Sequence, residues 1–157
     1  GANPHNDLDF RSSARVIIDH VIKGTETGKK NNLPDKIIDF IRTHHGTSTV
    51  QYFYRSFLNS NPEEEVDINE FTYPGPKPYS KETSVMMMAD AVEAASRTLK
   101  KYTPESIHDL VENIVAHQSE EDQFSDADLT FADITIIKEI FKNRLSNMYH
   151  SRIEYPE

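Results

Sequence analysis

Residues 80–105, SKETSVMMMADAVEAASRTLKKYTPE, decide the fold. Ser80 can cap a helix, and the apolar, alanine-rich run after it predicts a helix from Lys81 to about Lys101. Thr103-Pro104-Glu105 then supplies a capping hydroxyl, a proline at the first helical position and an acid in the first turn, which together mark a helix start. Two helices joined by a short connection, the first with small side chains that permit close packing, predict the centre of an all-α bundle.

Further helices are predicted on both sides of this pair. The chain has only five glycines, and no alternation of apolar and polar residues persists long enough to predict a strand. The run Tyr73–Pro78 contains three prolines and predicts an irregular loop. The remaining helices are predicted to start at Ser12 or Ser13, at Pro34, at Val50 and at Thr130, and Asn31-Asn32 is expected to end the first of them.

Length and composition exclude several classes of protein. The chain has 157 residues, of which 36% are hydrophobic, and its formal net charge is −9. The absence of cysteine excludes disulfides and thiolate metal sites. No apolar run approaches the roughly 18 residues that span a bilayer, and the acidic charge disfavours binding to a nucleic-acid polymer. We expect a single soluble helical domain over residues 1–157.

Three histidines are candidates for chemistry. His20 lies in an apolar helical run, so we expect its face of the helix to point inward, and Gly24, one turn later, permits a close approach by a backbone or a ligand. His44 and His45 precede Gly46, which predicts the helix end there. Because adjacent helical residues point about 100° apart, the pair can share a target only where the helix ends. A buried core histidine and a histidine pair on the helix dipole are the structural alternatives.

Asp90 is the fourth candidate. It lies in the middle of the apolar run Val85–Val92, where a buried carboxylate needs a cation or several hydrogen-bond donors. A salt bridge to an arginine of another helix is the alternative. Together with the three histidines it forms a set that suits Mn, Fe, Ni, Co or Zn more than Ca.

Five segments of the chain carry a family resemblance, which are, in order, Ile18–Val21, His44–Thr47, Tyr73–Pro78, Met88–Ala95 and Tyr149–Pro156. With these segments the chain resembles the cytoplasmic HD domain of bacterial seven-transmembrane HD proteins of the PgpH type. The resemblance implies an HD-type helical bundle acting as a metal-dependent phosphodiesterase that opens cyclic di-AMP to linear pApA. It also implies a cytoplasmic domain of an inner-membrane protein, without membrane contact of its own.

The resemblance assigns the metal ligands. His20 matches the family's single histidine, His44 and His45 match its pair, and Asp90 matches its late aspartate. The family's first histidine and its His-Asp dipeptide have no counterpart and would lie upstream of Gly1. We therefore expect a bundle that is incomplete at its N-terminus, with two metal ions in the parent protein, at most one in this chain, and little or no catalysis by the chain alone.

Other assignments are more peripheral. The dipeptide His108-Asp109 is expected to be a surface pair. Tyr73 could stack on adenine, and Lys77 and Arg152 could contact phosphate. An apolar groove left by the missing helix would favour a homodimer.

Two other functions remain open. One is a non-catalytic module that senses a nucleotide or transmits a signal through dimer contacts. The other is an acidic helical interaction domain whose histidines only pack.

Overall fold

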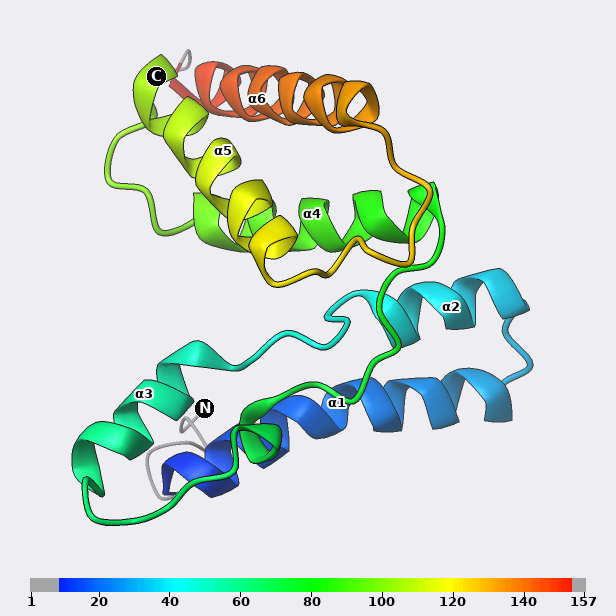
Figure 1. Cartoon of the computed structure of the whole chain (residues 1–157). Helices are drawn as coiled ribbons and strands as arrows, with labels where there is room; N and C mark the ends of the chain where they lie inside the picture. Colours follow the sequence, from blue (N-terminus) through cyan, green and yellow to red (C-terminus); the bar gives the residue numbers. More distant parts are fainter. Residues whose placement is uncertain (1–8, 154–157) are drawn as a thin grey trace. The chain divides into compact units, whose positions relative to one another are not determined.

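The computed structural model describes residues 9–153, with side chains through residue 150. The chain forms two compact units, Gly1–Lys77 and Pro78–Glu157, and the described residues form six α-helices, which are shown in Figure 1. Over the described residues the all-α prediction is confirmed, and a single isolated β-bridge joins Thr49 to Thr72. None of these helices is long and apolar enough to cross a membrane. That the two units form one domain stays a prediction.

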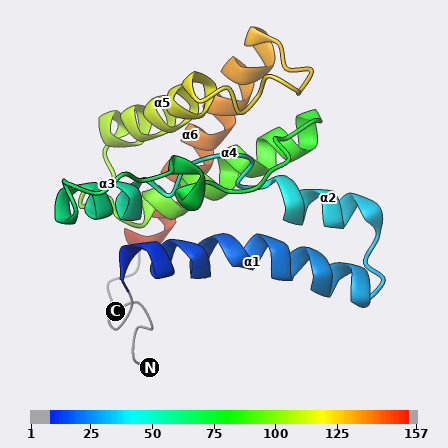
Figure 2. The same ribbon diagram turned by 60° about the horizontal axis from the view of Figure 1, so that its bottom comes forward.

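The first unit is organised around its longest helix. Helix α1 (Phe10–Lys30) packs against α2 (Asp35–Thr43), α3 (Gln51–Ser60) and the 3₁₀ helix η2 (Ile68–Phe71). Helices α1 and α2 run antiparallel (Figures 1 and 2). Two glycines of α1 lie at this contact. A Cβ at Gly24 would lie 3.2 Å from Ile41 Cγ2, which is a tight approach, whereas one at Gly28 would lie 3.4 Å from Ile41 Cδ1, which is an ordinary contact.

Two loop segments of this unit are joined by backbone hydrogen bonds. Val50 N–H donates to Phe71 O at 2.7 Å, and Tyr73 N–H donates to Ser48 O at 2.9 Å. Phe71 is also part of the buried apolar cluster of this unit, with Ala14 and Phe57. The segment after α2 is therefore held against the segment after η2.

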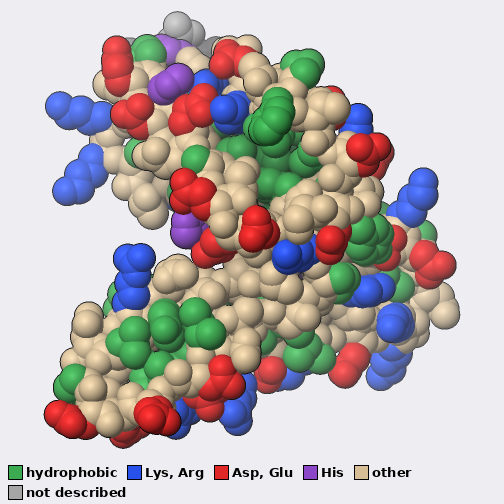
Figure 3. Space-filling model, in the orientation of Figure 1, with side chains coloured by type: hydrophobic (Ala, Val, Ile, Leu, Met, Phe, Trp, Pro, Cys, Tyr) green, Lys and Arg blue, Asp and Glu red, His purple; other side chains and the backbone are tan. Residues whose placement is uncertain are grey.

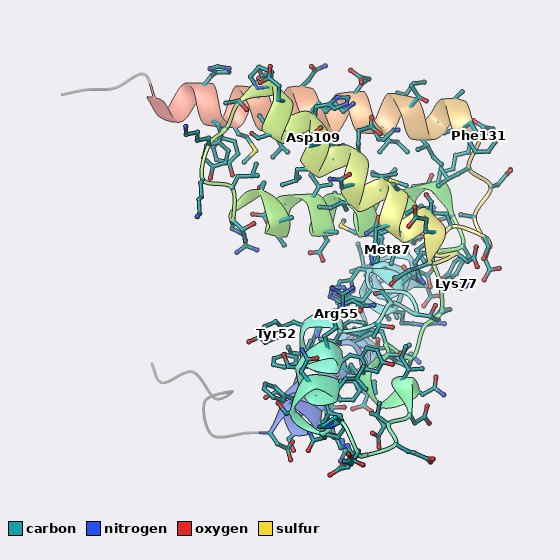
Figure 4. The ribbon with its side chains drawn as sticks, turned by 60° about the vertical axis from the view of Figure 1, so that its left-hand side comes forward. Tyr52, Arg55, Lys77, Met87, Asp109 and Phe131 are labelled. Carbon is teal, nitrogen blue, oxygen red and sulfur yellow. The ribbon has the colours of Figure 1, made fainter. Side chains whose placement is uncertain are left out.

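The second unit contains three helices: α4 (Lys81–Ser96), α5 (Pro104–Glu120) and α6 (Phe131–Ile153). All three contact one another. They enclose a buried apolar core to which each helix contributes, made of Val92, Ile107, Val111, Leu145 and Tyr149. Phe131, at the start of α6, lies outside this core and is 92% exposed (Figure 4).

Three of the predicted helix starts are confirmed. Ser80 Oγ accepts from Thr83 N–H, Thr103 Oγ1 accepts from Ser106 N–H, and Thr130 Oγ1 accepts from Asp133 N–H. In each case the third helical residue returns a side-chain bond to the backbone N–H of the cap, which is a capping box.

Two predicted boundaries are wrong. Helix α1 is capped by Asp9, whose carboxylate accepts from Ser12 N–H at 2.7 Å, and Ser13 is buried inside the helix. Helix α4 ends at Ser96 rather than near Lys101, because Thr98 N–H donates to Ala95 O and so begins a tighter turn. Both errors come from local bonds that several neighbouring residues could have made equally well.

Candidate metal centre

The end of α2 places two histidines on one side. The helix ends at Thr43, whose hydroxyl donates to Asp39 O at 2.7 Å, and His44 is its C-cap. Gly46 has a φ of 50°, a left-handed conformation that favours glycine. The chain therefore leaves the helix over residues 44–46, and the rings of His44 and His45 approach to 4.1 Å between centroids. The predicted helix end at Gly46 is confirmed to within this turn.

His20 joins them from α1. Its ring lies 5.3 Å from the ring of His44 and 5.0 Å from that of His45. One nitrogen from each of the three rings lies within 4.8 Å of the others. In the described part of the chain this is the one group of three or more His, Asp or Glu side chains close enough to hold a metal ion.

His20 itself is exposed, which contradicts the inward-facing helix surface expected for it. Val16, on the same side of α1, is 48% exposed. The buried residues of α1 are instead Ser13, Ala14, Val21 and Gly28. A buried core histidine is therefore not what the structure shows, and the position of His20 needs another explanation.

The hydrogen bonds of two rings define their tautomers. His20 Nδ1 contacts Ile17 O, and His44 Nδ1 lies 2.7 Å from Ile41 O. A carbonyl oxygen only accepts, so in each neutral ring Nδ1 carries the proton and Nε2 is left with a lone pair. These two Nε2 atoms lie 3.2 Å apart. Two lone pairs facing each other at this distance repel unless a proton or a metal ion lies between them.

That distance fits a metal ion. Two nitrogens bound to one tetrahedral metal at about 2.0–2.1 Å lie about 3.3 Å apart. The bonds from Nδ1 to backbone carbonyls are those that commonly orient metal-ligating histidines. The donor set and its spacing therefore fit a divalent transition metal.

His45 differs from the other two histidines in its surroundings. It is half-buried, and burial together with the neighbouring His44 and His20 lowers its pKa to about 3. The ring is therefore neutral, as a metal ligand must be. Tyr73 stacks on it with centroids 4.5 Å apart and ring planes 19° apart.

Asp90 is not buried as expected. It lies on α4, in the second unit, and its side chain is exposed. The buried positions of α4 are Thr83, Ser84, Met87, Met88, Val92 and Ser96, which form the other face of the helix. The argument from a buried carboxylate is therefore wrong. The part of Asp90 in the metal centre, which the resemblance suggested, stays a prediction.

The other residues singled out in the sequence lie on loops and on α5 and α6. Tyr73 is 8% exposed and is accounted for as a packing partner of His45, so a contact between this ring and a base stays a prediction. Lys77 is half-buried, and its contact with phosphate also stays a prediction. The side chain of Arg152 lies outside the described residues. His108 and Asp109 are both exposed on α5, as expected. Asp109 is labelled in Figure 4.

Sequence reasoning missed the roles of Ile17 O, Ile41 O and the Tyr73 ring. The two carbonyls could have been inferred, because each lies three residues before its histidine on a helix. No signal in the sequence brings Tyr73 to His45.

Relatives of known name share much of this sequence. The chain is 38% identical over 155 residues to cyclic-di-AMP phosphodiesterase PgpH of Bacillus subtilis, and 36% identical over 157 residues to that of Listeria monocytogenes. These matches cover 99% and 100% of the chain but 22% of each relative. The chain therefore spans about a fifth of the length of these curated relatives. No protein-family model matches it.

Solved structures resemble it over a larger share of their length. The crystal structure of the L. monocytogenes PgpH HD domain in complex with cyclic di-AMP has a TM-score of 0.91 and 35% identity. That match covers 98% of the chain and 71% of the solved chain. A second crystal structure of the same domain has a TM-score of 0.88 and 33% identity, and that match covers 96% and 69% of the two chains.

Proposed function

Because this chain belongs to the PgpH family of HD domains, we propose that it forms part of a metal-dependent phosphodiesterase that opens cyclic di-AMP to linear pApA. The observation that carries the proposal is the convergence of His20, His44 and His45, with two lone-pair nitrogens 3.2 Å apart. Three histidine ligands are a common arrangement of a catalytic metal site.

The residues of the chain have defined roles in this proposal. A divalent metal ion held by the three imidazoles would supply Lewis acidity toward a phosphodiester and would lower the pKa of water. His20 and His44 present Nε2 because Ile17 O and Ile41 O hold Nδ1. His45 is kept neutral by burial.

We propose Asp90 as a further ligand and the chain by itself as a site for at most one metal ion. The described residues contain one group of histidines at metal-binding distance, and a two-metal centre requires more donors than these. Mn, Fe, Ni, Co and Zn all suit imidazole ligands. On this basis the 157-residue chain alone should be inactive, and the longer protein that carries it should be active.

We base the choice of substrate on the net charge of the chain and on the ligand bound to a solved relative. The chain carries a formal net charge of −9, so diffuse attraction does not favour a dianionic dinucleotide. Phosphate anchored on metal, with Lys77 and Arg152 as supporting cations, is the alternative that we propose. The solved relative bound to cyclic di-AMP supports this choice of ligand.

The place of the domain in the cell is part of the same proposal. We propose that it is the cytoplasmic domain of a bacterial membrane protein, that it makes no membrane contact itself, and that it forms a homodimer. On α3, Tyr52 and Leu58 are exposed, and Figure 3 shows hydrophobic side chains gathered over this helix. An exposed apolar group of this kind is compatible with a contact to another chain.

The test uses the full-length protein with Mn²⁺ and cyclic di-AMP, and separates substrate from pApA by chromatography. His44→Ala and His45→Ala should each lower kcat/KM by at least a hundredfold. His117→Ala is the matched control, because His117 is an exposed histidine of α5 paired with Glu121 Oε1 at 3.1 Å. The control should keep wild-type activity.

Two results would contradict the proposal. One is a folded full-length protein that turns over no cyclic dinucleotide with any of the five metals. The other is full activity in both histidine variants. If the protein binds cyclic di-AMP without hydrolysing it, the non-catalytic sensing module replaces the enzyme.

A further inference from the structure

His45 lacks the support that the other two rings have. The rings of His20 and His44 are each oriented by a hydrogen bond from Nδ1 to a backbone carbonyl of their own helix. The described residues provide no such bond to the ring of His45, which lies beyond the last residue of α2. Since metal-ligating histidines are commonly oriented through their second nitrogen, something else must fix this ring.

Tyr73 is in position to do so. Its ring stacks on that of His45, with centroids 4.5 Å apart and planes 19° apart. Tyr73 also meets His20 edge-on, with centroids 6.0 Å apart. Nearly parallel stacking restricts rotation of an imidazole about its Cβ–Cγ bond, because any large rotation would drive it into the neighbouring ring.

Hydrogen bonds of Ser48 join the turn that carries His45 to the segment that carries Tyr73. Ser48 N–H and Ser48 Oγ both donate to His45 O, at 3.1 and 2.6 Å. The same serine accepts from Tyr73 N–H through its carbonyl, at 2.9 Å. Two residues after Tyr73, Gly75 has a φ of 81°, and a Cβ there would lie 3.1 Å from Thr47 Cγ2. The proline-containing loop is therefore packed directly against the turn that carries His45.

We propose that Tyr73 is a positioning residue for the metal centre, and that its ring orients His45 toward the site shared with His20 and His44. The inference rests on the proposed metal site. At His45 an aromatic stack takes the place of the hydrogen bond that usually orients a histidine ligand. The flat ring should therefore be essential and the hydroxyl dispensable.

The test measures the affinity of the whole chain for Zn²⁺ by competition with a chromophoric chelator. Tyr73→Phe keeps the ring and should bind Zn²⁺ within about threefold of wild type. Tyr73→Leu removes the ring and should weaken binding by about 10- to 100-fold, the range for loss of a group that orients a ligand. Phe131→Leu is the control for loss of an aromatic ring elsewhere, because Phe131, at the start of α6, is 92% exposed (Figure 4). It should bind as wild type does.

Since Tyr73 is buried, Tyr73→Leu can fail to fold, and two further measurements cover that case. Tyr73→Met keeps an apolar side chain of similar length without a flat ring, and it should weaken binding as Tyr73→Leu does. In the Zn²⁺-loaded wild type, nuclear Overhauser effects should connect the ring protons of Tyr73 and His45. Absence of these effects would overturn the proposal without any variant.

Other outcomes separate this inference from the proposed function. If wild type binds no Zn²⁺, the metal site itself is wrong, and the inference is overturned with it. If wild type binds and His45→Ala weakens binding while folded Tyr73→Leu or Tyr73→Met does not, only the positioning role is refuted. An equal loss in Tyr73→Phe would assign the effect to the hydroxyl and would also refute the stack.

Discussion

Replacing His20 with alanine separates metal binding from packing. His20 is exposed, so little apolar contact is lost with its ring. The variant also removes the Nε2–Nε2 approach of 3.2 Å to His44, which is unfavourable without a cation. In the presence of a chelator, the free energy of unfolding of His20→Ala should therefore stay within about 0.5 kcal/mol of the wild-type value, as for an ordinary surface substitution.

With metal the two proteins should differ. A ligand at a hundred times its Kd stabilises the folded state by about 2.7 kcal/mol. Loss of a group that only orients a ligand weakens metal affinity by about 10- to 100-fold, and loss of the ligand itself should cost at least as much. At the same Zn²⁺ concentration the variant should then gain only about 1.4 to 0.4 kcal/mol from the metal.

The assay is thermal unfolding followed by circular dichroism, with Zn²⁺ at a hundred times the wild-type Kd and again with excess chelator. The expected difference in metal-dependent stabilisation is about 1.3–2.3 kcal/mol between wild type and His20→Ala. His117→Ala should show the full wild-type gain. If His20→Ala gains as much from Zn²⁺ as wild type does, His20 is not a ligand and the reasoning from the facing Nε2 atoms is refuted.

Three other predictions concern separate parts of the chain. Glu112 accepts from two lysines of α6, which lower its pKa from 4.5 to about 2, so its stabilising effect is present above pH 4.5 and is lost as the pH falls toward 2. Because this carboxylate is one-third exposed, Glu112→Gln should cost about 1 kcal/mol at pH 7 and nothing near pH 2, as measured by urea unfolding at both pH values. Gly28→Ala should raise the free energy of unfolding by up to about 1 kcal/mol, because the added Cβ would make ordinary contacts. Gly24→Ala should give no such gain, because its Cβ would lie 3.2 Å from the side chain of the β-branched Ile41. Equal shifts of the melting temperature in both variants would contradict this account. Asp90→Asn in the full-length protein should lower kcat/KM for cyclic di-AMP by at least tenfold while leaving the melting temperature in chelator unchanged, since the side chain is exposed; unaltered turnover would remove Asp90 from the site.

The helix pattern was predictable because its signals are short-range. A capping hydroxyl and the N–H that it binds lie three residues apart, as at Ser80, Thr103 and Thr130. A window of four residues therefore contains both partners. The same logic failed where several candidates compete within one turn. Asp9 caps α1 although Ser12 and Ser13 are also capping residues, and the burial of Ser13 depends on contacts that the local sequence does not reveal.

Exposure was harder to predict from neighbours along the chain. Asp90 and His20 both have apolar neighbours, and both were expected to face inward. Both side chains are exposed instead. Successive residues of a helix point about 100° apart, so apolar residues at adjacent positions do not show that a side chain lies in the core.

The amino-acid order alone was enough to identify the α-helical class, the chemistry of the candidate ligands and the family. Each of these depends on residue types and on spacings of a few positions. The meeting of His20 with a histidine 24 positions later, and the stacking of Tyr73 on His45, required the folded chain. Contacts between distant segments are set by helix packing at Gly24 and Gly28 and by the pairing of the two loop segments. These contacts join residues far apart in the sequence, and no local sequence pattern specifies their geometry.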